Sequence, residues 1–255
     1  MKKGIIYGKE SIQDWDRADA KIMEIDAVVD LYGFSILSEA TDFAGQTIKL
    51  TKSISLDPSV EWIPIGSTSK PFAGTFDGGM NTITGMYVDN ETAYIGMFAV
   101  TAPSSMVKNF YLEDSEFIYS GPSLKYNEEK QKDEEVGAYM GSIVGDLRGD
   151  LDTVYSSATV KSVAMQVGGL VGRANGLKVD EKYTTSTINN CWFDGQVVLT
   201  GKTARYAGGI AGVTVQGNIE ITNCLNTGSV TAGSEQSGGL IGWYYTSDES
   251  VIQNS

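Results

Sequence analysis

The sequence contains no histidine and only two cysteines in 255 residues. Without histidine, the chain lacks the commonest general base, the commonest zinc ligand and every Ser–His or Cys–His nucleophile pair. The two cysteines, Cys191 and Cys224, cannot build the disulfide framework of a small secreted domain. We therefore expect no cofactor, no metal centre and no catalytic residue of these classes.

Basic residues and long apolar runs are also scarce. The chain has 19 Lys and Arg against 32 Asp and Glu, a formal net charge of −13, which argues against nucleic acid or an anionic membrane as partner. No stretch approaches the ~18 apolar residues that cross a membrane. Residues 1–16 lack the apolar core of a signal peptide. Hydrophobic residues nevertheless make up 41% of the chain, enough for a packed core.

What the sequence does contain is glycine, in a repeat. The Gly-rich blocks are IGMFA (95–99), GSIVG (141–145), GGLVG (168–172), GGIAG (208–212) and GGLIG (238–242). The segments that follow them are VKNF (107–110), VYSS (154–157), INNC (188–191), ITNC (221–224) and IQNS (252–255). A third apolar landmark then follows nine or ten residues later, at Phe117, Val163, Val197 and Val230. The repeats are 46, 27, 40 and 30 residues long, and the two long ones carry charged insertions at 124–135 and 178–186.

Three apolar landmarks per repeat predict an all-β fold, a parallel and right-handed β-helix in which each short strand pairs with its counterpart one coil away. A β-sandwich or a propeller is the alternative architecture; a propeller blade needs about 40–45 residues, so a repeat of 27 residues is too short for a propeller. Equivalent positions in the repeat predict structural roles. Glycines supply corners with positive φ and close backbone approach, at Gly169, Gly209 and Gly239. Asparagines form a corner ladder, at Asn190, Asn223 and Asn254.

Cys191 and Cys224 are also equivalent, and we interpret them as small buried hydrophobic residues one coil apart. A disulfide is the alternative, but parallel stacking suits its geometry poorly.

The N-terminal segment, residues 1–34, contains the only amphipathic helix that the sequence predicts. Over residues 17–32, apolar residues recur on one face at Ile22, Ile25, Val28, Val29 and Tyr32, and Gly33 follows as a stop signal. We expect this helix to cap the first coil of a β-helix over 35–255, because an uncovered coil exposes unpaired strand edges.

Four segments carry a family resemblance: FAGQTIKLTKSISL (43–56), EWIPIG (61–66), PFAGTFDGGMNTITGM (71–86) and YIGMF (94–98). With the Gly-rich blocks, they resemble proteins that carry the GLUG motif, over roughly residues 35–255. One departure is that the usual Gly-x-Gly-His after the aspartate reads Gly78, Gly79, Met80, Asn81.

The resemblance implies a β-helical bacterial surface or secreted protein, adhesin-like or beside the catalytic part of immunoglobulin A1-specific metallopeptidases. It implies no catalytic residue, because the zinc motif of that peptidase needs histidine.

Candidate binding residues are aromatic. Trp243, Tyr244 and Tyr245 follow GGLIG, and Trp192 follows INNC; exposed rings stack on sugars and anchor protein interfaces. Packing on the next coil is the alternative. Asp77 in TFDGG is interpreted as a corner aspartate that accepts bonds from backbone amides, with calcium ligation as the alternative.

Carboxylates after GSIVG, at Asp146, Asp150 and Asp152 with Arg148, could support polysaccharide chemistry, although a solvated loop is the simpler interpretation. The charged insertions are expected to be solvated loops, with docking as the alternative.

These observations favour a non-enzymatic, extracellular or cell-surface module with an adhesin-like or spacer role, whose partner is a glycan or protein of a host or neighbouring cell. A polysaccharide-degrading enzyme and a purely structural stalk are the alternatives. IQNS ends the chain in mid-coil, so we expect a longer parent protein with other domains.

Overall fold

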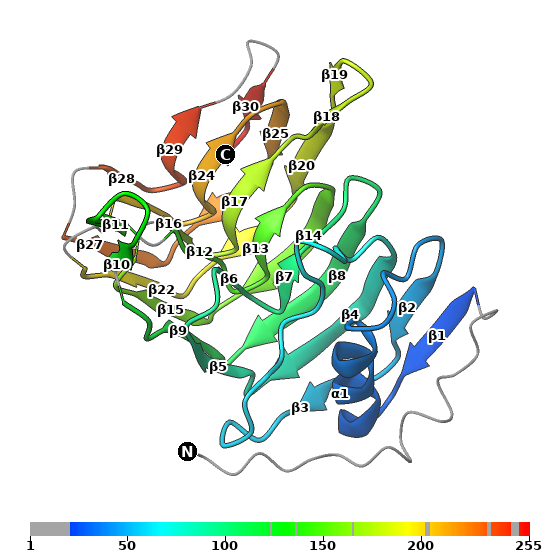
Figure 1. Cartoon of the computed structure of the whole chain (residues 1–255). Helices are drawn as coiled ribbons and strands as arrows, with labels where there is room; N and C mark the ends of the chain where they lie inside the picture. The colour runs from blue at the N-terminus through cyan, green and yellow to red at the C-terminus, as the bar shows by residue number, and fades with distance from the viewer. Residues whose placement is uncertain are drawn as a thin grey trace.

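The computed structural model describes residues 21–122, 124–135, 137–164, 166–201, 205–233, 236–245 and 250–255. This part of the chain is all-β with a single helix, which confirms the predicted class (Figure 1). Apart from two antiparallel hairpins, the sheets are built by parallel pairing between segments that succeed one another along the chain. Within the described residues, no helix is long and apolar enough to cross a membrane.

An 11-stranded sheet, sheet I, extends from the first described strand to the last (Figure 1). Its strands are β1 (Ile22–Ile25), β2 (Thr47–Leu50), β3 (Ile54–Ser55), β4 (Thr75–Thr84), β8 (Met106–Glu113), β14 (Asp150–Ser156), β20 (Thr185–Asn189), β21 (Trp192–Phe193), β25 (Asn218–Thr222), β26 (Leu225–Asn226) and β30 (Val251–Gln253).

Three five-stranded sheets complete the body of the molecule. Sheet II consists of β6 (Tyr94–Ile95), β12 (Tyr139–Met140), β16 (Gln166–Gly168), β23 (Tyr206–Gly208) and β28 (Gln236–Gly238). Sheet III consists of β7 (Phe98–Val100), β13 (Val144–Leu147), β17 (Val171–Asn175), β24 (Ala211–Val215) and β29 (Ile241–Tyr245). Sheet IV consists of β5 (Tyr87–Asn90), β9 (Glu116–Tyr119), β15 (Thr159–Ser162), β22 (Gln196–Leu199) and β27 (Ser229–Ala232). In chain order a full repeat visits sheets II, III, I and IV.

The register corrects the predicted alignment of the second repeat. Leu151, and not Val154, pairs with Val107 and Ile188. Val160, and not Val163, pairs with Phe117 and Val197. Both predicted landmarks are therefore displaced by three residues. Leu151 and Val154 are both buried, so hydrophobicity alone does not distinguish them.

The predicted helix over 17–32 is wrong in its bounds. Residues 22–25 form β1, which pairs in parallel with β2, and α1 spans Val28–Leu37 and passes through Gly33. In β1 the more buried residues alternate with period two, which suits a strand edge rather than a helix. The predicted boundary at residue 34 falls within α1, and the part of the prediction before residue 21 lies outside the described residues.

The helix α1 packs through aromatic contacts. Phe34 is fully buried, and its ring lies 5.0 Å from that of Phe43 and 5.8 Å from that of Phe72. At the start of α1 the Asp30 carboxylate accepts a hydrogen bond from the Ala27 amide at 3.1 Å. Satisfying a free amide in this way stabilises a helix N-terminus by roughly 1 kcal/mol.

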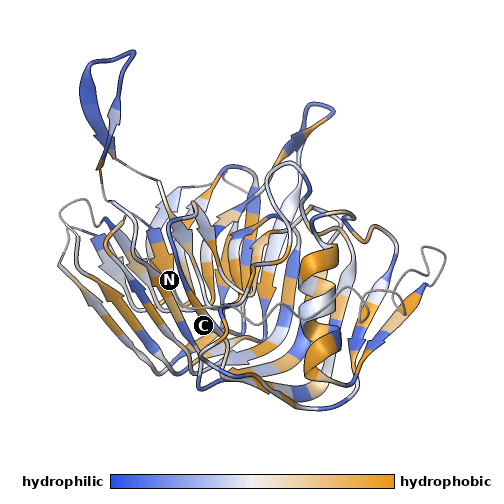
Figure 2. Ribbon diagram, turned by 60° about the horizontal axis from the view of Figure 1, so that its bottom comes forward, coloured by the Kyte–Doolittle hydropathy of each residue, from blue (hydrophilic) through white to orange (hydrophobic). Residues whose placement is uncertain are grey.

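The charged insertions each contain a short antiparallel hairpin. The first pairs β10 (Leu124–Asn127) with β11 (Lys132–Glu135), and the second pairs β18 (Lys178–Val179) with β19 (Lys182–Tyr183). Both hairpins project from the body of the molecule (Figure 2).

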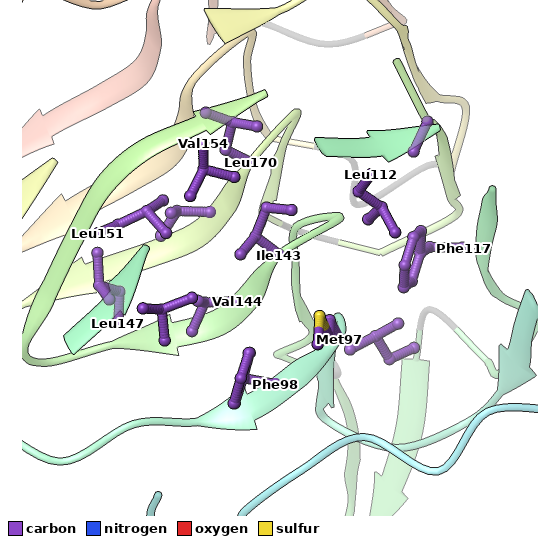
Figure 3. Packing of buried hydrophobic residues seen from close by; sticks show 14 of the residues in the cluster. Met97, Phe98, Leu112, Phe117, Ile143, Val144, Leu147, Leu151, Val154 and Leu170 are labelled. Carbon is purple, nitrogen blue, oxygen red and sulfur yellow. The ribbon is translucent and has the colours of Figure 1, made fainter. Parts of the chain in front are cut away.

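The core is built from residues of all four sheets. Leu112 of β8, Phe117 of β9 and Val144 of β13 are fully buried and belong to one apolar cluster, part of which is drawn in Figure 3. Fully burying a side chain of this kind contributes roughly 1.5–3 kcal/mol. A continuous core of this kind holds the outward-facing side chains of sheet I in fixed rows.

Candidate functional site

The outward face of sheet I carries the first candidate site. On β14, Leu151 and Val154 are buried, whereas Asp150, Asp152 and Tyr155 are partly exposed. Thr153 between them has a φ of +54°, so the strand bends there and two successive side chains leave the core side, while β14 stays in register with β8; we call this bend the bulge. Because neighbouring strands are in register, equivalent side chains form rows that run across the repeats.

The bulge itself forms one of these rows. Its members all have a left-handed φ, between +53° and +59°, at Asn109, Thr153, Asn190, Asn223 and Asn254. Asparagine tolerates this conformation better than other residues with a Cβ. The Asn190 amide nitrogen donates to Asp152 Oδ1 at 3.2 Å, and that of Asn223 donates to Asn189 Oδ1 at 3.0 Å. Asn190 and Asn223 of the predicted ladder thus bond to polar side chains of the neighbouring repeat.

A polar row runs beside the bulge row, and its charges alternate over several strands. Its members are Glu24, Lys49, Asp77, Lys108, Asp152, Asn189, Thr222 and Gln253. Asn189 donates to Asp152 Oδ1 at 2.8 Å, and the Thr222 hydroxyl donates to Asn189 Oδ1 at 2.7 Å. Asp77 Oδ1 accepts from the Gly79 amide at 3.0 Å and lies in this row as a corner residue. The row contributes to register, because a slip would separate the opposite charges that now lie side by side on neighbouring strands.

An aromatic row lies on the other side of the bulge, and we define it as Tyr111, Tyr155 and Trp192. The rings of Tyr111 and Tyr155 are 6.0 Å apart, and those of Tyr155 and Trp192 are 4.9 Å apart in an edge-to-face arrangement. Trp192 is 42% exposed, and its indole nitrogen donates to Thr227 Oγ1 at 2.7 Å. The row continues with Leu225, which pairs with Trp192 and is 51% exposed. These contacts fix the rings while their outer surfaces stay open.

Asp150 and Asp152 lie on the polar-row side of the bulge, two residues apart on the same face of β14. Partial burial raises the pKa of Asp150, and the neighbouring charge of Asp152 adds to the effect. Asp146, the third predicted carboxylate, lies instead on sheet III and is fully buried. The structure therefore separates the predicted acidic group. Within the described part of the chain, no three His, Cys, Asp or Glu side chains are grouped to hold a metal ion.

The structure also places the predicted aromatic binding residues, Trp192 and Trp243 to Tyr245, in separate parts of the molecule. Trp243 stacks on Tyr206 with ring centroids 4.6 Å apart and lies 5.7 Å from Tyr245. Tyr244 pairs with the buried Thr214 and does not share these contacts. Trp192 is on a different sheet.

Sequence reasoning missed Tyr111, Tyr155 and Tyr206. In both β8 and β14, a tyrosine stands two residues after the left-handed position: Tyr111 after Asn109 and Tyr155 after Thr153. This spacing was the available signal.

The predicted structural glycines lie at the tight bend between sheets II and III. A Cβ at Gly169 would lie 2.1 Å from the Gly209 carbonyl oxygen and 2.4 Å from the Phe193 ring. A Cβ at Gly209 would lie 2.4 Å from the Gly239 carbonyl oxygen. None of these three glycines has a positive φ, so at Gly169 and Gly209 close approach, and not a left-handed corner, requires glycine.

Cys191 and Cys224 are buried free thiols at equivalent positions in neighbouring repeats, directly before β21 and β26 of sheet I. The Cys191 thiol contacts the Asn189 carbonyl oxygen at 3.1 Å, and Cys224 contacts that of Thr222 at 3.3 Å. Burial raises the pKa of Cys191 well above its ordinary value, so its thiol is protonated at neutral pH.

No protein-family profile and no curated protein matches the sequence. The fold is similar to the crystal structure of a candidate immunoglobulin A1 protease from Bacteroides ovatus, with a TM-score of 0.66 and 18% sequence identity. The match covers 89% of this chain and 62% of that protein, so this chain spans less than two thirds of its length. At this identity the similarity shows a shared fold alone. It agrees with the resemblance to repeats found beside such proteases, while no family match confirms the GLUG motif.

Proposed function

We propose that the repeats form the coils of a right-handed parallel β-helix, and that the aromatic row of sheet I binds glycans as part of a bacterial surface or secreted protein. The parallel pairing of each strand with its counterpart in the next repeat supports the β-helix. The shared fold with a protein named for an immunoglobulin A1 protease supports a bacterial context. The observation that carries the binding role is the row itself: Tyr111, Tyr155 and Trp192 on three consecutive strands.

The geometry suits an extended ligand. Neighbouring strands are about 4.8 Å apart, so the three rings span about 10 Å along the stacking direction. Aromatic faces attract the C–H faces of sugar rings, and such rings are worth most when they are rigid before binding. The polar row, three residues away across the bulge, offers the second amide hydrogen of Asn189 and the hydroxyl oxygen of Thr222 to sugar hydroxyl groups. A linear oligosaccharide lying along the repeats would contact both rows.

An array of neutral and acidic glycans, probed with the purified chain, tests the proposal. We expect retention of at least one glycan class, and at least a tenfold loss of affinity for Trp192→Ala and Tyr155→Ala, corresponding to about 1.4 kcal/mol. Tyr183→Ala is the matched control, because Tyr183 is 45% exposed in the second hairpin, away from the row. A chain that binds no glycan, or a control variant that loses as much affinity as the row variants, would refute the glycan role and favour a protein partner or a stalk.

Polysaccharide hydrolysis is the second candidate, and one observation favours it. Asp150 and Asp152 lie two residues apart on the same face of β14, across the bulge from the aromatic row, and the raised pKa of Asp150 suits a general acid. If the chain releases reducing ends from a retained glycan, both Asp150→Asn and Asp152→Asn should abolish the release and leave binding intact. Equal release by wild type and both variants would exclude this pair as the catalytic residues.

A further inference from the structure

A fully buried carboxylate joins two arginines at the surface formed by sheets II and III. Arg173 donates to both oxygens of Asp146, from Nε and from Nη2, each at 2.7 Å. Arg148 donates from Nε to Asp146 Oδ2 at 2.8 Å. The side chain of Asp146 is 0% exposed, and those of Arg148 and Arg173 are 14% and 16% exposed. The bidentate geometry fixes the plane of the Arg173 guanidinium.

This cluster has an excess of positive charge. Asp146 is the only acidic side chain within ion-pair distance of either arginine among the described residues. Two guanidinium groups share one carboxylate, so a nearly buried site keeps a net charge of +1. A charge in such surroundings is costly unless it is paired, so the cluster favours an incoming anion. This is notable in a chain whose overall charge is −13.

Tyrosine rings hold the Arg173 guanidinium from one side. Its carbon lies 4.1 Å from the centroid of Tyr139 and 5.8 Å from that of Tyr94. The two tyrosine rings are stacked on neighbouring strands with centroids 5.4 Å apart. Cation–π contact and the Asp146 bonds together prevent reorientation, so the charge is positioned before any ligand arrives.

A buried acceptor lies in the next strand of sheet II. Gln166 pairs in register with Tyr139 on one side and Tyr206 on the other. Its side chain is 8% exposed, and its Oε1 atom has no hydrogen-bond partner among the described residues. Leaving a buried acceptor unpaired is destabilising, and a ligand hydroxyl or N–H that reached it would recover that energy.

The same surface continues into an aromatic stack. Tyr206, the neighbour of Gln166, lies under Trp243, and Trp243 contacts Tyr245. Trp243 is 40% exposed and Tyr245 is 61% exposed, so both offer ring surface to a ligand. Positive charge, a free acceptor and open aromatic faces therefore succeed one another along sheets II and III.

We infer that Arg148, Arg173, Gln166, Tyr206 and Trp243 form a second binding site, for an oligosaccharide that carries a carboxylate. The carboxylate would pair with the excess charge of the arginines. A sugar hydroxyl would donate to Gln166 Oε1, and a neighbouring ring would stack on Trp243. This site deepens the proposed glycan role by naming an acidic ligand class, but it lies on different sheets from the aromatic row and does not require that row.

The test compares binding of an oligogalacturonate and of its methyl ester by isothermal titration calorimetry. We expect the free acid to bind at least tenfold more tightly than the ester, with affinity falling as salt increases. Arg148→Gln should weaken binding of the acid at least tenfold. This variant keeps the bidentate pair of Asp146 with Arg173, so the remaining buried charges stay balanced.

Gln166→Leu provides a second variant that does not disturb the ion pairs. It removes the unpaired acceptor, so the fold should be at least as stable, while affinity for the acid should fall about tenfold. Trp192→Ala, on sheet I, should leave this binding unchanged, which distinguishes the second site from the aromatic row. Equal binding of acid and ester, or unchanged affinity in both Arg148→Gln and Gln166→Leu, would overturn the inference. Equally tight binding of acetate alone would show a simple anion site and overturn the assignment to a sugar.

Discussion

Single residues with left-handed backbone set the shape of sheet I. Four of the five positions in the bulge row are asparagines, and the fifth is Thr153. A residue with a Cβ pays roughly 1–2 kcal/mol for this conformation, which asparagine offsets in part by local hydrogen bonds. The bulge puts two successive side chains on the outward face and thereby separates the polar row from the aromatic row.

We predict that Asn190→Gly changes the free energy of unfolding by less than about 1 kcal/mol, whereas Asn190→Val lowers it by at least 1–2 kcal/mol. Glycine adopts the φ of +53° freely, but a β-branched residue does not. Urea unfolding followed by circular dichroism measures both values. Gln196→Val, at an exposed position on β22 outside the left-handed row, should be nearly neutral. A glycine variant less stable than the valine variant would contradict this account of the row.

At the scale of elements, the Gly-rich blocks determine how sheets II and III meet. Each block forms a bend between two short strands, such as β16 and β17, and the backbones on either side come too close for a side chain. The loss of stability caused by replacing one of these glycines with alanine should therefore depend on the neighbouring atoms of the next repeat and not on the φ of the glycine. Gly169 and Gly239 occupy the same place in their repeats but differ in this respect: nothing lies within 4 Å of a Cβ at Gly239.

We predict that Gly169→Ala lowers the free energy of unfolding by about 1–3 kcal/mol, because the new methyl group meets the Gly209 carbonyl oxygen and the Phe193 ring. Gly239→Ala, the matched control, should change it by less than about 0.5 kcal/mol. Thermal and urea unfolding of both variants provide the comparison. Equal destabilisation would mean that local backbone freedom, and not contact between repeats, requires glycine at these bends.

Across the whole molecule, each repeat is covered by the next, and burial therefore falls toward the last described repeat. Ile221 is fully buried, whereas Ile252, its partner in register, is 44% exposed. In stacked repeats, stability depends on interfaces between neighbours, and a repeat with one interface opens more easily than a repeat with two.

We therefore predict a gradient of amide hydrogen exchange in this chain. Amides of β27, β29 and β30 should exchange at least tenfold faster than those of β9, β13 and β14, measured by mass spectrometry at neutral pH. The difference should persist when the exchange of each peptide is corrected for its intrinsic rate. Uniform protection across the repeats would show that the molecule opens only as a single cooperative unit.

The sequence by itself determined the all-β class, the recurrence of apolar and glycine positions, and the equivalence of Asn190 with Asn223. These are local patterns, and each repeat presents them again. Only the tertiary structure decided the register of the second repeat, where Leu151 and Val154 are equally apolar, and the conversion of residues 22–25 into a strand that pairs with β2. It also decided which side chains meet. Tyr155 meets Trp192, and Asp146 meets Arg173, across 37 and 27 residues of chain. Such pairs follow from the exact length of each connection, and a displacement of one residue would turn every side chain of a strand to the other face.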